Sequence, residues 1–122
     1  MPHYSATSLD RLNTCDERLV DLFIEVIKHR DCRIICGHRG EEEQNDAYHQ
    51  GHSQVKFPNS NHNVYPSRAV DVAPYPIDWQ DIDRFKFLGG FVLGVAAAMK
   101  IPLKWGGEWS SFKDYPHFEL TE

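Results

Sequence analysis

The spacing of apolar residues and the residues typical of helix ends predict three helices along the chain. Residues 16–29 place their apolar side chains three and four positions apart, which gives one apolar face. Residues 80–100 form the longest helix, and because its part from residue 87 to residue 99 is apolar almost all round, we expect it to be buried. Residues 41–50 form a polar helix, with glutamates in its first turn and Gly51 just past its end.

Short runs between these helices predict four strands. Residues 32–37 are mostly apolar and end at Gly37, whereas residues 68–73 alternate, with Asp71 on one side and Val70 and Val72 on the other. Residues 52–67 are rich in glycine, serine, proline and asparagine and form an irregular loop. Residues 103–105 and 116–120 form the last two strands. The order of elements predicts an α+β fold, with a small antiparallel sheet flanked by helices.

Length and composition limit the classes of function. The 122 residues fit one domain, residues 1–122, and the formal net charge of −5 without a long basic run gives no support for nucleic acid binding. The longest apolar stretch is broken by glycines and falls short of the roughly 20 residues that cross a bilayer. The N-terminus lacks the basic and apolar parts of a secretory signal. We therefore expect a monomer that stays in the cytoplasm until another protein opens the membrane.

The three cysteines, Cys15, Cys32 and Cys36, are an odd number without metal-type spacing. We expect them to be buried free thiols, since cysteine behaves as a small hydrophobic residue. Cys32 and Cys36 lie four apart in a strand, which predicts that they share one face.

His62, Asp71 and His117 are the strongest candidates for chemistry. Taken singly, each has an ordinary explanation: a surface loop histidine, a buried aspartate paired with Arg39 or Arg68, and a core histidine. Taken together, two imidazoles and one carboxylate are normal zinc ligands. Three protein ligands also leave a fourth position open for water, as in catalytic zinc sites. The chain therefore first suggests a small zinc hydrolase.

Other polar and aromatic residues can complete such a site. Asp114 precedes His117 by three residues and can accept a proton from metal-bound water, or simply form a turn. Arg39 follows a strand end, where it can stabilise an oxyanion or lie on the surface. Trp105 and Trp109 flank a glycine pair and can line a peptide groove or anchor a loop.

Four segments of the chain carry a family pattern: residues 60–62, 67–74, 105–109 and 114–118. They resemble the M15 zinc peptidases, a group of D-Ala-D-Ala carboxypeptidases, dipeptidases and phage endolysins that act as L-alanyl-D-glutamate peptidases. The likeness is greatest to the endolysin branch, which has a tryptophan–double-glycine loop and an Asp-x-Pro-His-Phe tail. The spacing from His62 to Asp71 is nine residues where the group usually has seven, a difference that a loop absorbs.

The resemblance implies specific roles. One zinc ion per chain would be held by His62, Asp71 and His117, with Asp114 as general base and Arg39 as the residue that stabilises substrate or transition state. It also implies the fold shared with the hedgehog signalling domain and the D-Ala-D-Ala peptidases.

The substrate implied by the resemblance is the peptidoglycan stem peptide, cut by a phage endolysin next to a D-residue. Gln44, Ser60, Trp105 and Trp109 are the expected substrate contacts. Two alternatives stay open: a D-Ala-D-Ala carboxypeptidase or dipeptidase, and a zinc-stabilised binding domain without activity.

Overall fold

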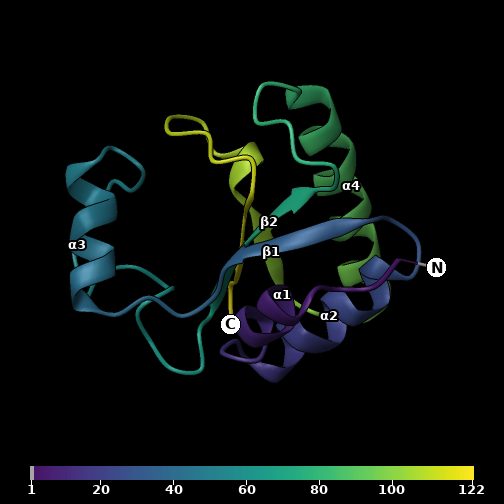
Figure 1. The fold of residues 1–122 in the computed structure, drawn as a ribbon, viewed down its shortest axis with the longest axis horizontal. Helices are drawn as coiled ribbons and strands as arrows, with labels where there is room; N and C mark the ends of the chain where they lie inside the picture. The colour runs from purple at the N-terminus through teal and green to yellow at the C-terminus, as the bar shows by residue number, and fades with distance from the viewer. Residues whose placement is uncertain (1) are drawn as a thin grey trace.

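The computed structural model describes residues 2–122. Within this range the elements follow in the order α1 (Ala6–Leu12), α2 (Glu17–Ile27), β1 (Cys32–Cys36), α3 (Glu41–His49), β2 (Ala69–Pro74), α4 (Ile82–Ala98), β3 (Leu103–Trp105), the 3-10 turn η1 (Gly106–Glu108) and β4 (His117–Leu120). The strands form one antiparallel sheet in the order β1-β2-β4-β3. Helices α1, α2 and α4 gather beside the sheet, whereas α3 stands apart from them (Figure 1). The predicted α+β class is confirmed.

Alternation along the strands gives the sheet one apolar and one polar face. In the pairing of β2 with β4, Val70 lies opposite Phe118 and Asp71 lies opposite His117. Val70 and Phe118 belong to the buried core, together with Val72 of the same sheet face. The register therefore places Asp71 and His117 side by side on the other face.

The apolar face of the sheet is covered mainly by α2 and α4. The apolar residues that the spacing of α2 predicts to share one face are all buried, and the ring of Phe23 meets that of Phe118 edge-on at 5.6 Å. Asp16 caps the N-terminus of α2, where its side chain accepts a hydrogen bond from the backbone N–H of Arg18. This packing fixes the strands that carry the polar face.

The expectation that α4 is buried all round is wrong. One face, which includes Leu88 and Val92, packs in the core, but Phe87 is 60% exposed and Met99 is also exposed. The helix packs against the sheet and beside α2, so its remaining sides face solvent. Among the described residues, no helix is long and apolar enough to cross a bilayer.

Helix α1 was not predicted, because seven residues with few apolar positions give little periodic signal. Tertiary contacts hold it in place. Ser5 caps its N-terminus, Leu12 is fully buried, and the hydroxyl of Ser8 accepts a hydrogen bond from the backbone of Ile34 in β1.

Cys32 and Cys36 do not share a sheet face, contrary to the expectation. A β-bulge between Ile34 and Cys36 shifts the register, so that Cys36 pairs with Asp71 and lies on the polar face. Cys15 and Cys32 are buried free thiols as expected, but Cys36 is only partly buried.

Candidate metal centre

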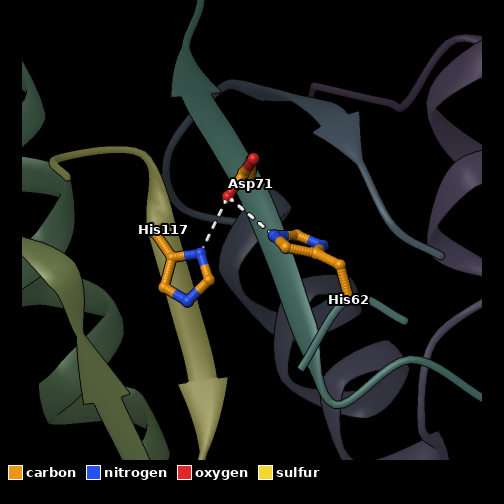
Figure 2. Close-up of side chains that lie close together, drawn as sticks. All are labelled: His62, Asp71 and His117. Carbon is orange, nitrogen blue, oxygen red and sulfur yellow. Dashed lines mark hydrogen bonds and ion pairs between the residues drawn. The ribbon is translucent and has the colours of Figure 1, made fainter. Parts of the chain in front are cut away.

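His62, Asp71 and His117 converge at the centre of the polar sheet face (Figure 2). Asp71 Oδ1 lies 3.3 Å from His62 Nε2 and 3.1 Å from His117 Nδ1. One potential ligand atom from each residue lies within 4.8 Å of the others. Asp71 comes from β2 and His117 from the adjacent β4, while His62 comes from the loop that precedes β2. The three residues that the sequence singled out therefore form one cluster.

The ring of His62 is oriented by the backbone. Its Nδ1 lies 2.7 Å from the carbonyl oxygen of Gly37, and since a carbonyl only accepts, Nδ1 must carry the proton. In the neutral ring Nε2 then carries a lone pair. Nε2 is buried and, although Asp71 Oδ1 lies 3.3 Å away, it makes no hydrogen bond of good geometry with any described residue. A buried nitrogen without a partner is costly, and a metal ion beside Asp71 would satisfy it.

The ring of His117 is oriented by a carboxylate. Its Nε2 lies 2.6 Å from Glu119 Oε1, which leaves Nδ1 to face Asp71. Both imidazoles thus turn one nitrogen toward Asp71 and use the other for a fixed hydrogen bond. Two oriented nitrogens and one carboxylate oxygen fit a metal ion.

Asp71 also pairs with Arg39, as one of the ordinary explanations proposed. Its Oδ2 lies 3.3 Å from the Arg39 guanidinium, while Oδ1 faces the two histidines. Burial opposes ionisation, but the adjacent imidazoles His62 and His117 hold the pKa of Asp71 well below its usual range. The carboxylate is therefore charged. Its Oδ2 pairs with the Arg39 guanidinium, and its Oδ1 faces the candidate metal site.

Asp114 lies at the edge of the same cluster, with Oδ2 3.9 Å from His117 Nδ1. Burial, and then the charge of Asp71, raises its pKa to about 6. The loop that carries Asp114 approaches Gly106 so closely that a Cβ at Gly106 would collide with the Asp114 carbonyl oxygen. The backbone N–H of Asp114 donates to the Gly106 carbonyl at 3.1 Å, which holds the carboxylate near the site.

Two cavities flank the cluster. One of about 320 Å³ is lined by His62, His117 and Trp109, and the other of about 790 Å³ by Asp71, Cys36 and Trp79, among others. They have a set of lining residues in common: Arg39, His52, Phe112 and Asp114. The candidate metal site thus lies where two hollows meet.

The residues expected to contact substrate fall into two groups. Ser60 and Trp109 line the smaller cavity, and the Ser60 hydroxyl also accepts from the backbone N–H of His62 at 3.1 Å. Trp105 instead belongs to the core, where Gly89 and Gly107 let their backbones approach its ring, and it lines neither cavity. Gln44 is fully buried beneath Arg39, to which its carbonyl oxygen is bonded at 3.0 Å.

Three residues of the site were missed by the sequence reasoning. Glu119 accepts from His117, and His52 and Phe112 each line both cavities. The alternation of β4 carried the signal for Glu119, because residues two apart in a strand share one face. No periodic pattern identifies Phe112, which lies in an irregular loop.

Known proteins are similar to this chain in sequence, and one of them also in fold. Residues 2–121 match the family described as phage L-alanyl-D-glutamate peptidase. The peptidoglycan L-alanyl-D-glutamate endopeptidase CwlK of Bacillus subtilis is 30% identical over 103 residues, which cover 74% of this chain and 60% of CwlK. The crystal structure of the Serratia marcescens L-Ala D-Glu endopeptidase ChiX matches with a TM-score of 0.84 at 28% identity, over 99% of this chain and 90% of ChiX. The chain belongs to the phage L-alanyl-D-glutamate peptidase family, within the M15 zinc peptidase group.

Proposed function

We propose that this protein is a zinc-dependent endopeptidase that cuts the L-alanyl–D-glutamate bond of the peptidoglycan stem peptide. One observation carries the proposal: two imidazole nitrogens and one carboxylate oxygen face one another where two cavities meet, in a chain of this family. CwlK and ChiX, which are similar to it, are both described as endopeptidases for this bond.

The donor set favours zinc. His62, Asp71 and His117 offer two nitrogens and one oxygen, which suit zinc, whereas calcium and magnesium prefer oxygen ligands alone. Structural zinc sites usually have four protein ligands, so a set of three indicates a catalytic site. When bound, zinc supplies a Lewis acid that polarises the scissile carbonyl and lowers the pKa of a coordinated water.

Asp114 is the best-placed proton acceptor. Its carboxylate lies beside His117 but outside the three-residue cluster, and it lines both cavities. A base is most effective when its pKa is near the working pH, and burial moves the pKa of Asp114 up to about 6. We assign to it the removal of a proton from the attacking water and its delivery to the leaving amine. A domain that only binds would not need this residue.

Arg39 supplies positive charge at the junction of the two cavities. Gln44 and Asp71 hold its guanidinium from two sides, at 3.0 and 3.3 Å. A fixed cation there can stabilise the negative charge that develops on the scissile oxygen. Because Gln44 is fully buried, we assign it the positioning of Arg39 in place of the substrate contact first expected.

The cavities favour an endopeptidase over a carboxypeptidase. An endopeptidase must accept peptide on both sides of the scissile bond, and two cavities that have four lining residues in common border the candidate metal site. A carboxypeptidase needs a cation to hold the terminal carboxylate; among the described residues Arg39 is the one arginine or lysine that lines either cavity, and we assign it to the scissile oxygen.

Digestion of purified peptidoglycan by the zinc-loaded protein tests the proposal. We expect fragments that begin with a D-glutamate amino group, identified by end-group labelling and mass spectrometry. Release of free D-alanine would support the carboxypeptidase instead. Intact peptidoglycan in the presence of stoichiometric zinc would contradict any peptidase function on this substrate.

A further inference from the structure

The two histidines of the candidate metal site are supported differently. A neutral backbone carbonyl, that of Gly37, holds His62, whereas a carboxylate, that of Glu119, holds His117. A carboxylate forms the stronger, charge-assisted bond with an imidazole N–H. It also makes the opposite ring nitrogen a better electron donor toward a metal ion.

Glu119 contacts both parts of the site. Its Oε1 lies 2.6 Å from His117 Nε2, and its Oε2 accepts from the Asn61 side chain at 2.9 Å. Asn61 is the neighbour of His62 in the loop, so Glu119 connects the strand that carries one ligand to the loop that carries the other. Its side chain is 22% exposed at the edge of the smaller cavity, where solvent only partly weakens these bonds.

We propose that Glu119 is a positioning residue for the metal site, which fixes the His117 tautomer and holds the His62 loop against β4. This inference rests on the proposed metal site. Without the carboxylate, His117 can place its proton on Nδ1, the nitrogen that must be free to bind metal. Its ring can also rotate, and the Asn61 side chain loses its partner.

Zinc affinity of purified variants tests the role directly. Competition with a chromophoric chelator gives the zinc dissociation constant without any assay of activity. Outer-shell partners of metal-bound histidines typically contribute about 10–100-fold to affinity, so we expect a loss of this size for Glu119→Ala. Glu119→Gln keeps a neutral acceptor and should lie between the wild type and the alanine variant.

Glu108→Gln is the matched control, because it removes the same charge from an exposed residue that lines neither cavity. It should bind zinc like the wild type. Asn61→Ala breaks only the link to the loop and should weaken zinc binding less than Glu119→Ala. If Glu119→Ala does not fold, the zinc dissociation constant of Glu119→Gln is compared with that of Glu108→Gln instead.

A merely structural role would lower stability but leave the tautomer of His117 unchanged. Long-range ¹H–¹⁵N spectra of the metal-free protein, recorded at a pH high enough to make the ring neutral, should show the proton of the wild-type ring on Nε2 and a mixture of tautomers in Glu119→Ala. Zinc affinity of Glu119→Ala and Glu119→Gln equal to that of Glu108→Gln would overturn the inference and leave the proposed function standing. A wild-type protein that binds no zinc would overturn both.

Discussion

The two halves of the site are held by different forces. Asp71 and His117 lie opposite each other on paired strands whose reverse face is packed against the apolar core. Arg39 and His62 belong to the segment 38–66, in which the buried side chains, those of Gln44 and His62, are both polar. The sheet half is therefore ordered by apolar burial, and the segment 38–66 by hydrogen bonds and, we propose, by the metal ion.

Hydrogen bonds within this segment show how it is ordered. The Gln44 amide donates to the Val55 carbonyl at 2.7 Å, and Asn63 donates to the Arg39 carbonyl at 3.1 Å. The Arg39 N–H in turn donates to the His62 carbonyl at 2.8 Å. Each such bond contributes only about 1 kcal/mol net to stability. The comparison predicts that loss of a single polar contact disturbs the segment 38–66 more than it disturbs the sheet.

The largest expected effect is on the rate of cleavage, in a variant that leaves the sheet and the segment 38–66 folded. Asp114→Asn keeps the size of the side chain but removes the base, so we expect kcat for stem-peptide cleavage to fall by about 10²–10⁴-fold. Zinc content should stay at the wild-type level, because Asp114 is not among the three clustered ligands. Asp83→Asn, on the exposed face of α4, is the control. Undiminished cleavage by Asp114→Asn would remove it from the mechanism.

Breaking the sheet half should cost the most stability. Phe23 is fully buried and its ring meets Phe118 on β4, so Phe23→Ala should lower the free energy of unfolding by about 3–5 kcal/mol. Urea denaturation followed by circular dichroism measures the change. A loss below about 1 kcal/mol, as expected of a surface site, would show that this contact does not support the sheet.

A substitution in the segment 38–66 should lower the free energy of unfolding less than Phe23→Ala does, but should lower activity more. Gln44→Ala leaves the Arg39 guanidinium without one partner, and we expect a loss of about 1–3 kcal/mol in the free energy of unfolding. Activity should fall further than that of a core variant matched for stability, because Arg39 becomes misplaced. Gln44→Glu keeps an acceptor for Arg39 and should recover part of kcat. Equal activities of Gln44→Ala and the stability-matched variant would argue against the positioning role.

The smallest expected effect is a pH dependence that separates metal-free from metal-loaded protein. Burial lowers the pKa of His117, but hydrogen bonds to Asp71 and Glu119 more than offset this and raise it to about 9. Its pKa in the unfolded chain is about 6.5, so its stabilising contribution is complete below that pH and is lost as the pH rises toward 9. The pKa of His62 is displaced in the same direction, since the charge of Asp71 outweighs burial.

Thermal unfolding measured from pH 6 to pH 10 tests this linkage. Metal-free protein should lose stability across the range, whereas zinc-loaded protein should lose less, because histidines that bind zinc stay neutral throughout it. A His117→Asn variant should flatten part of the metal-free curve. Identical curves with and without zinc would contradict the assignment of His117 as a ligand.

Sequence and structure agree where a local rule determines the outcome. The alternation around Asp71 correctly separates it from Val70 and Val72, which pack in the core, and the helical spacing of residues 16–29 predicts α2. Predictions from local spacing fail where tertiary contacts determine the structure. Helix α1 depends on its packing against β1, and a single bulge turns Cys36 to the opposite face. Trp105 faces the core because Gly89 and Gly107 make room for its ring, which no spacing reveals.

The residues of the candidate site could be predicted from the sequence, but the orientation of their side chains could not. The convergence of His62, Asp71 and His117 follows from their chemistry and from the family resemblance. Their orientation depends on partners distant in the sequence, such as Gly37 for His62, and on Glu119, two residues past His117. Such partners are identified only once the strands are placed in register.

The most direct test of the central claim is a titration of zinc into metal-free protein, followed by ¹⁵N spectra of the histidine rings. One equivalent of zinc should move the resonances of His62 Nε2 and His117 Nδ1, the two nitrogens that face Asp71, and saturate there. Signals that do not change, or that move at His62 Nδ1 and His117 Nε2 instead, would contradict the account.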